Sequence, residues 1–164
     1  MESVPYDQRT GKLWFNGKII DWKEAKIHVL NHGLHYASCV FEGERVYEGD
    51  IFKQEEHTER LFYSAKRMGI EVPYSEKEIN EACKAIVSIQ KVQNGYVRPV
   101  IWRGSEMMAI SAQKNKINVA IATWEWGSYF DPKLKLNGIK LNISSWRRPA
   151  PNSIPWDTKA SGLY

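Results

Sequence analysis

A lysine and a tyrosine stand five positions apart in the closing stretch of the sequence, at Lys159 and Tyr164. A lysine amine is a nucleophile that forms a Schiff base with a carbonyl compound, and a nearby phenol can hydrogen-bond the product. Taken alone, the stretch is more typical of a polar segment with a solvated lysine, because residues near a terminus are often loosely held. The upstream residues must decide between these two interpretations.

Two arginines occur where they could bind an anion. Arg60 follows His57 by three positions in a segment of helical periodicity, so their side chains share a helix face. Arg98 follows Tyr96 by two positions in a segment of strand periodicity, so these two point the same way. A guanidinium can bind a phosphate or a carboxylate bidentately. Each arginine could equally be a surface charge, and Pro99 favours an edge strand or an irregular position for Arg98.

Patterns for metal binding and for disulfides are weak. His32 and His35 have no third ligand of matching spacing nearby, so we expect no metal site. Cys39 and Cys83 could form one disulfide, but reduced thiols in the cytoplasm are the default expectation. The sequence has no apolar run of membrane-spanning length and does not open on a signal-peptide pattern.

Length and composition indicate a folded domain. The chain has 164 residues, of which 43% are hydrophobic and 26% charged, enough for one compact domain with a real core. The formal net charge of +4 is mild, and the basic residues are scattered rather than clustered. We therefore expect no nucleic-acid partner, whereas an anionic small molecule suits the charge.

The order of patterns predicts an α+β fold, with two main helices on one side of a mostly antiparallel sheet. Asn16-Gly17 predicts a tight hairpin turn, and Ser75 with Glu78 fits a helix-capping box. The expected elements are hairpins over 12–21 and 41–52, helices over 54–68 and after 75, and strands over 95–104, 117–124 and 139–145. A loop over 105–116 carries apolar residues that something should cover.

Six blocks of sequence, in the same order, resemble branched-chain amino acid aminotransferases from about residue 12 onward. The blocks are residues 32–43, 56–65, 95–99, 126–129, 144–147 and 159–164. The resemblance implies pyridoxal 5'-phosphate (PLP) as cofactor and the fold type IV shared with D-amino-acid aminotransferases and aminodeoxychorismate lyases. It also implies a small N-terminal domain over 1–130. Residues 131–164 would be the connection to a larger PLP-binding domain, truncated after the lysine block.

The resemblance assigns roles by position. Lys159 would form the Schiff base with PLP and move a proton at the substrate α-carbon, Tyr164 would hydrogen-bond the phenolic oxygen of PLP, and Arg60 would hold its phosphate. Arg98 would recognise the side-chain carboxylate of glutamate. The remaining substrate-binding positions are Phe41, Tyr96, Trp126 and Tyr129 in the same subunit's pocket, and Tyr36 and Ile110, which would reach into a neighbouring subunit's pocket.

The implied reaction is transamination between L-leucine, L-isoleucine or L-valine and 2-oxoglutarate, giving branched-chain 2-oxo acids and L-glutamate. The partners would be these amino and 2-oxo acids and further copies of the chain, as a dimer or higher oligomer. Three alternatives stay open: a D-amino-acid aminotransferase, an aminodeoxychorismate lyase, and a non-catalytic association module that docks through 105–116.

The family's chains continue well past this lysine, and the later part supplies the acidic partner of the pyridine nitrogen and most of the phosphate contacts. The sequence is therefore expected to be an N-terminal fragment that is inactive or nearly so by itself. In that fragment we expect Lys159 to be exposed and poorly restrained.

Overall fold

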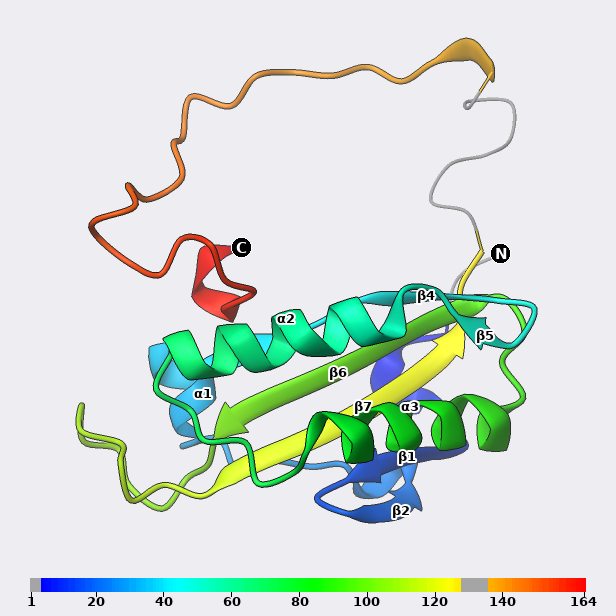
Figure 1. Ribbon diagram of the computed structural model, residues 1–164, viewed down its shortest axis with the longest axis horizontal. Coiled ribbons are helices and arrows are strands. Elements are labelled where there is room, and N and C mark those ends of the chain that lie inside the picture. Colours follow the sequence, from blue (N-terminus) through cyan, green and yellow to red (C-terminus); the bar gives the residue numbers. More distant parts are fainter. Residues whose placement is uncertain (1–3, 128–135) are drawn as a thin grey trace.

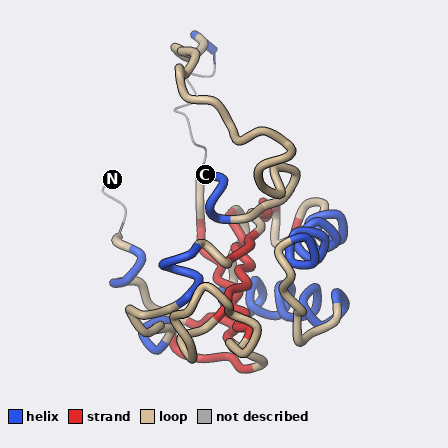
Figure 2. The backbone as a smooth tube through the Cα atoms, turned by 90° about the vertical axis from the view of Figure 1, so that its left-hand side faces the viewer, coloured by secondary structure: helices blue, strands red, loops and turns tan. Residues whose placement is uncertain are grey.

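The computed structural model describes residues 4–127 and 136–164. Within them, an antiparallel sheet is covered on one face by two long helices, α2 (Gln54–Arg67) and α3 (Glu76–Gln90) (Figures 1 and 2). The strands are β1 (Lys12–Phe15), β2 (Lys18–Asp21), β3 (Cys39–Phe41), β4 (Glu44–Tyr47), β5 (Asp50–Ile51), β6 (Gly95–Arg103) and β7 (Ile117–Glu125). The shorter helices are α1 (His32–Tyr36) and the 3-10 turns η1 (Tyr6–Gln8), η2 (Trp22–Glu24) and η3 (Ser161–Leu163).

The sheet runs in the order β2-β1-β7-β6-β4-β5, and β3 pairs with β6 beside β4. Every pairing of these strands is antiparallel. The long β6 and β7 therefore form the middle of the sheet. This arrangement confirms the α+β architecture and the placement of both long helices on one side.

Local sequence signals determine several boundaries. Asn16 and Gly17 have φ angles of 47° and 85°, the left-handed values that a tight hairpin between β1 and β2 needs. The Ser75 Oγ accepts the N–H of Glu78, and the Glu78 carboxylate accepts the N–H of Ser75, so α3 opens on the expected capping box. Gly69, with φ of 65°, follows the end of α2.

The core lies between the sheet and the two long helices. Alternate side chains of β6 and β7 point into it, while α2 and α3 contribute residues at helical spacing. Its buried members include Val97, Ile101, Val119, Ile121, Leu61, Ala65, Ile79, Cys83 and Ile86. The opposite face of β6 carries Tyr96 and Arg98, whose side chains are joined by a hydrogen bond of 3.2 Å.

Of the two positions suggested by Pro99, the edge is wrong, because β6 is a central strand, whereas the irregular position agrees with the break between β3 and β4 that Pro99 faces. The main-chain carbonyl of Pro99 accepts the N–H of Glu42, in the break between β3 and β4. In a strand the N–H and C=O of one residue point to the same side. The missing donor of Pro99 therefore faces this break and removes no bond to β7.

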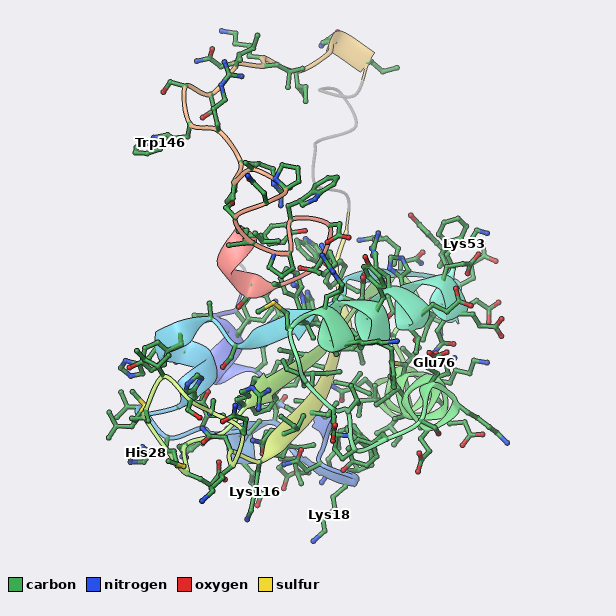
Figure 3. All side chains as sticks on the ribbon, turned by 60° about the vertical axis from the view of Figure 1, so that its left-hand side comes forward. Lys18, His28, Lys53, Glu76, Lys116 and Trp146 are labelled. Atoms are coloured by element: carbon green, nitrogen blue, oxygen red, sulfur yellow. The ribbon has the colours of Figure 1, made fainter. Side chains whose placement is uncertain are left out.

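The strand expected over 139–145 is also wrong. Residues 136–156 pass over α2 at a distance from the sheet and then return toward it, mostly as loop (Figure 1), and none of them belongs to a strand. Trp146 points away from the rest of the molecule (Figure 3) and is 89% exposed. A strand requires a hydrogen-bonded neighbour, and in the described residues this β-prone run has none.

The boundary expected at 130–131 lies outside the described residues, so the domain division stays a prediction. Cys39 and Cys83 are both unpaired thiols, and Cys83 lies in the core with its pKa well above the usual value because of burial. Across the described ranges, every helix is too short or too polar to cross a membrane.

Candidate active site

The main chain around Lys159 is held on both sides. Its N–H donates to the Oγ of Ser64 on α2 at 3.0 Å, and its carbonyl accepts the N–H of Phe41 at the end of β3 at 3.1 Å. The next residue, Ala160, is buried and forms an antiparallel bridge with Val40. The lysine segment thus lies across the junction of α2 and β3.

A second contact holds the segment just before the lysine. The Tyr63 hydroxyl donates to the Asp157 carboxylate at 2.5 Å, and Arg67, one turn further along α2, lies 3.6 Å from the same carboxylate. These bonds hold the pKa of Asp157 below its usual value, with the Tyr63 hydrogen bond as the main cause. The helix therefore grips the segment through Asp157 and through Ser64.

The Lys159 amine points at Tyr164. Its Nζ donates to the Tyr164 Oη at 3.0 Å and lies 4.7 Å from the centre of the Phe41 ring. The Phe41 and Tyr164 rings meet edge to face. The hydrogen bond from Lys159 lowers the pKa of Tyr164, and the nearby Arg148 adds to the effect. The Lys159 amine and the Tyr164 phenol thus form a hydrogen-bonded pair that packs on the Phe41 ring.

The expectation that Lys159 is exposed and poorly restrained is wrong. The residue is only partly exposed, and its backbone makes the two bonds to Ser64 and Phe41. The sequence could not show this, because Ser64 and Phe41 lie about a hundred residues upstream and reach the lysine only after β3 and α2 have packed together.

A continuous wall of rings and one guanidinium runs from the lysine along the open face of β6. Arg98 lies over the Phe41 ring at 4.6 Å and over the Tyr96 ring at 5.1 Å. Tyr96 in turn packs edge to face on Trp126, with ring centres 4.9 Å apart. The wall therefore joins four of the expected substrate-binding residues and places them next to Lys159.

Gly43 lets this wall come close to the strand break. A Cβ added at Gly43 would overlap the Oη of Tyr96. Tyr96 cannot easily move aside, because its ring is packed between Trp124 and Trp126 and its hydroxyl accepts from Arg98. The glycine is required here for close approach rather than for an unusual φ angle.

Arg60 forms a forked ion pair that the sequence analysis missed. Its Nε and Nη2 donate to the two oxygens of the Glu42 carboxylate at 2.6 and 2.9 Å. The Nδ1 of His57 lies 2.8 Å from one of those oxygens. Burial opposes ionisation of Glu42, but the bonds from Arg60 and His57 outweigh it and lower its pKa. Arg60 was expected to be either a surface charge or a phosphate-binding group. The structure adds that a buried acid, Glu42, sets the orientation of its guanidinium.

Glu42 and Glu44 were not identified as site residues, yet both are completely buried. A signal was present in the sequence, because Val40, Glu42, Glu44 and Val46 alternate with period two. A strand that buries Val40 and Val46 must turn the two acids to the same inner side, and all four residues are buried. The compact Glu-Gly-Glu-Arg stretch instead resembles a solvated turn.

Tyr36 and Ile110 do not join the lysine cluster. The Tyr36 hydroxyl donates to the carbonyl of Met108 at 3.2 Å, so α1 and the loop over 105–116 lie side by side. Ile110 is 88% exposed. Tyr129, the last expected substrate-binding residue, lies outside the described residues.

The two histidines that suggested a metal have other contacts. The ring nitrogens of His32 lie 2.7 Å from the Ser38 hydroxyl and 3.1 Å from the Ala109 carbonyl, and Nε2 of His35 lies 2.9 Å from the Val29 carbonyl. In the part of the chain that the structure describes, no three His, Cys, Asp or Glu side chains cluster as metal ligands would.

Comparison with known proteins reveals the family. The model of amino-transferase class IV matches residues 39–161, a range that includes Phe41, Arg60 and Lys159. The chain belongs to the class IV aminotransferases. Among curated members, the branched-chain-amino-acid aminotransferase of Pseudomonas aeruginosa is 41% identical over 160 residues, which is 95% of this chain and 52% of that protein. The enzyme of the same name from Escherichia coli (strain K12) is 38% identical over 157 residues, 93% of this chain and 51% of that protein.

Solved class IV structures share the fold. The branched-chain amino acid aminotransferase of T.th. with pyridoxamine 5'-phosphate has a TM-score of 0.89 at 37% identity, covering 95% of this chain and 53% of that one. The E. coli enzyme has a TM-score of 0.85 at 35% identity, with 95% and 53% coverage. This chain thus spans about half the length of the curated relatives and solved structures it matches, and it has the fold of their N-terminal part.

Proposed function

We propose that this chain carries the lysine-bearing part of a PLP-dependent aminotransferase that acts on branched-chain amino acids. The reaction is transfer of the amino group between L-leucine, L-isoleucine or L-valine and 2-oxoglutarate. The observation that carries the proposal is the hydrogen-bonded pair of Lys159 and Tyr164 seated on Phe41, at the end of the wall that contains Arg98. Membership of the class IV aminotransferases and the names of the relatives support the substrate class.

The side chains present fit PLP. The cofactor has a carbonyl carbon that needs an amine, a phenolic oxygen that needs a hydrogen-bond partner and a phosphate that needs a cation. Lys159 supplies the amine, Tyr164 the hydroxyl and Arg60 the guanidinium. The Arg60 fork to Glu42 uses Nε and Nη2, so Nη1 is left to face an anion.

When bound, PLP withdraws electrons from the substrate α-carbon and so makes its proton acidic. The protein's own groups then orient and move the proton. Lys159 is the base and acid at the α-carbon, and its segment is fixed by Ser64 and Phe41 so that the amine stays in place. Tyr164 holds the phenolic oxygen, and its lowered pKa suits a hydroxyl that shares a proton with a neighbour.

The wall along β6 suits two kinds of substrate. The rings of Phe41, Tyr96 and Trp126 bury a leucine-like side chain and exclude water from it. Arg98, which donates to the hydroxyl of Tyr96, also donates to the side-chain carboxylate of glutamate or 2-oxoglutarate. Tyr129, outside the described residues, is kept as a further proposed substrate-binding residue.

Tyr36 and Ile110 act on a second copy of the chain. Tyr36 lies on α1 and bonds the Met108 carbonyl of the loop over 105–116, the loop that also carries the largely exposed Ile110. An exposed apolar side chain of this size favours a covered position in an assembly. We propose a homo-oligomer, a dimer or larger, in which this surface closes the substrate pocket of the neighbouring copy.

We keep the division into a small domain over 1–130 and the start of a larger PLP-binding domain over 131–164, in a cytoplasmic enzyme. Because the relatives are about twice as long, we expect the 164 residues by themselves to show little or no transamination. We therefore propose the activity for the full-length protein that contains these residues.

The test is an assay of that protein with PLP and 2-oxoglutarate, in which the formation of both L-glutamate and pyruvate is followed. L-leucine, L-isoleucine and L-valine should each give L-glutamate, while D-alanine and aminodeoxychorismate should not react. Turnover of D-alanine or of aminodeoxychorismate alone would assign the other activities of this fold. Uptake of no PLP, together with stable self-association, would indicate the association module instead.

A further inference from the structure

The Glu42 carboxylate is an unusual partner for a phosphate-binding arginine, because it has no exposed surface. It lies where β3 ends and β4 begins, and its main-chain N–H is bound to the carbonyl of Pro99 on the central strand β6. Both of its oxygens are used, by Arg60 on one side and by Arg60 with His57 on the other. The acid is therefore fixed in both backbone and side chain.

The arginine, in contrast, stands at the boundary with solvent. The Arg60 side chain is 50% exposed, although its partner is completely buried. A long side chain at such a place would otherwise sample many rotamers, and binding an anion would require ordering it. The fork to Glu42 removes this freedom in advance and engages Nε and Nη2, so that Nη1 stands outside the fork.

The same helix face carries both groups that PLP would need from α2. Arg60 and Ser64 are one turn apart, and Ser64 holds the Lys159 segment while Arg60 is held by Glu42. Fixing Arg60 thus fixes the guanidinium on the same helix face that holds the Lys159 main chain.

We propose that Glu42, supported by His57, is a positioning residue that orients Arg60 for the phosphate of the cofactor. This inference rests on the proposed function, because it assumes that PLP binds beside Lys159. It adds that the phosphate grip depends on a buried carboxylate that never touches the ligand. Removal of the Glu42 carboxylate should therefore weaken the binding of only those ligands that carry the phosphate.

The experiment compares PLP with pyridoxal, which has the same ring and carbonyl but no phosphate, by fluorescence titration of the native full-length protein. Glu42→Gln should weaken PLP binding at least about tenfold and leave pyridoxal binding within about twofold of wild type, since only the phosphate contact loses its orientation. Glu59→Gln, which removes an equal charge from an exposed position next to Arg60, should change neither value.

A double-mutant cycle with Arg60→Ala separates positioning from a general effect. If Glu42 acts through Arg60, adding Glu42→Gln to the Arg60→Ala protein should lower its PLP affinity by less than about twofold. Two patterns of loss would overturn the inference. One is an equal loss of affinity for PLP and for pyridoxal in Glu42→Gln, and the other is a double variant whose loss of PLP affinity is the product of the two single losses. Unchanged PLP affinity in a folded Glu42→Gln protein would also overturn it.

Arg60→Lys keeps the test decisive if Glu42→Gln does not fold. Lysine retains the charge but cannot form the fork, so it should lose PLP affinity at least about tenfold with pyridoxal unaffected. Wild-type PLP affinity in the Arg60→Lys protein would refute the inference. If wild-type protein takes up no PLP at Lys159, the proposed function fails and this inference with it, whereas normal uptake with an insensitive Glu42→Gln contradicts the inference alone.

Discussion

The main-chain N–H of Lys159 donates a 3.0 Å hydrogen bond to the Oγ of Ser64, a side chain on α2 with no exposed surface. The bond ties the lysine to the helix that also carries Arg60. A reactive amine is useful only if its backbone holds it at a constant distance from its substrate. Ser64 thus connects the packed helix α2 to the backbone of the candidate catalytic lysine.

Ser64→Ala tests this link. Loss of the acceptor leaves the Lys159 N–H unsatisfied in a partly buried place, so the free energy of unfolding should fall by about 1–3 kcal/mol. The amides of residues 157–164 should also exchange hydrogen faster. Urea unfolding and hydrogen–deuterium exchange measure the two effects.

Ser88→Ala is the matched control for that experiment, because Ser88 is exposed on the neighbouring helix α3. It should leave both stability and exchange near wild type. A Ser64→Ala protein whose closing segment exchanges as slowly as wild type would show that Ser64 does not hold the lysine.

Gly43→Ala should disturb the wall along β6. The new methyl group must displace the Tyr96 hydroxyl, so the bond from Arg98 is lost and the rings repack. We expect a loss of about 1–3 kcal/mol in the free energy of unfolding, as for other overpacked sites. Thermal unfolding measures it, and tryptophan fluorescence should report the altered contacts of Trp124 and Trp126 with Tyr96.

Gly127→Ala provides the comparison, since a Cβ there meets no atom of the described residues within 4 Å and the φ angle is not in the left-handed region. It should be close to neutral. Equal stability of the two alanine variants would mean that Tyr96 can yield without cost and that the close approach at Gly43 has no consequence.

Glu44 should make stability depend on pH. Burial raises the pKa of its carboxyl to about 8, and the nearby Glu42 adds to the rise. Among residues 4–127 and 136–164, neither Glu44 oxygen has a hydrogen-bond partner. The folded protein therefore holds this proton more tightly than the unfolded chain. Its contribution to stability is present at low pH and is lost as pH rises from the unfolded pKa toward 8, by at most about 1.4 kcal/mol per pH unit.

Urea unfolding of Glu44→Gln between about pH 5 and pH 9 checks this sign. The glutamine protein should lack the decline, so its advantage over wild type should grow as pH rises and level off above about pH 8. Glu71→Gln, at an exposed position, should follow the wild-type curve. A constant difference between Glu44→Gln and wild type across the range would contradict a buried neutral acid.

Arg98→Gln should separate the two substrates of the proposed reaction. The KM for 2-oxoglutarate should rise about 10–100-fold, because an anionic side chain loses a charge-assisted hydrogen bond, while the KM for L-leucine changes little. Steady-state kinetics of the full-length enzyme measures both. Equal increases for the two substrates would place Arg98 in general support of the site rather than in recognition of a carboxylate.

Much of the fold follows from local signals. Asn16-Gly17 determines a hairpin turn, Ser75 with Glu78 begins α3, and the alternation along β6 correctly puts Tyr96 and Arg98 on one face. These patterns work because the forces that produce them act over a few residues. The strand expected over 139–145 failed for the opposite reason, since its pairing depends on a distant neighbour that the described chain does not offer.

The contacts that surround the expected site residues were less accessible. The positions named by resemblance include Lys159, Tyr164 and Arg98, which do lie in one cluster with Phe41. The buried partner of Arg60 was missed because Glu42 is eighteen positions away and looks like a turn residue. A buried carboxyl group stays ionised, as Glu42 does, when long-range packing supplies its cation, and spacing alone does not reveal such a pair.

Covalent capture of PLP tests the central claim most directly. The native full-length protein is incubated with PLP, reduced with borohydride, digested and analysed by mass spectrometry, with Lys159→Ala as the control. We expect the reduced cofactor on the peptide that contains Lys159 and none on the alanine protein. Capture spread over surface lysines, or undiminished capture in the alanine protein, would contradict the assignment of Lys159 as the cofactor-binding amine.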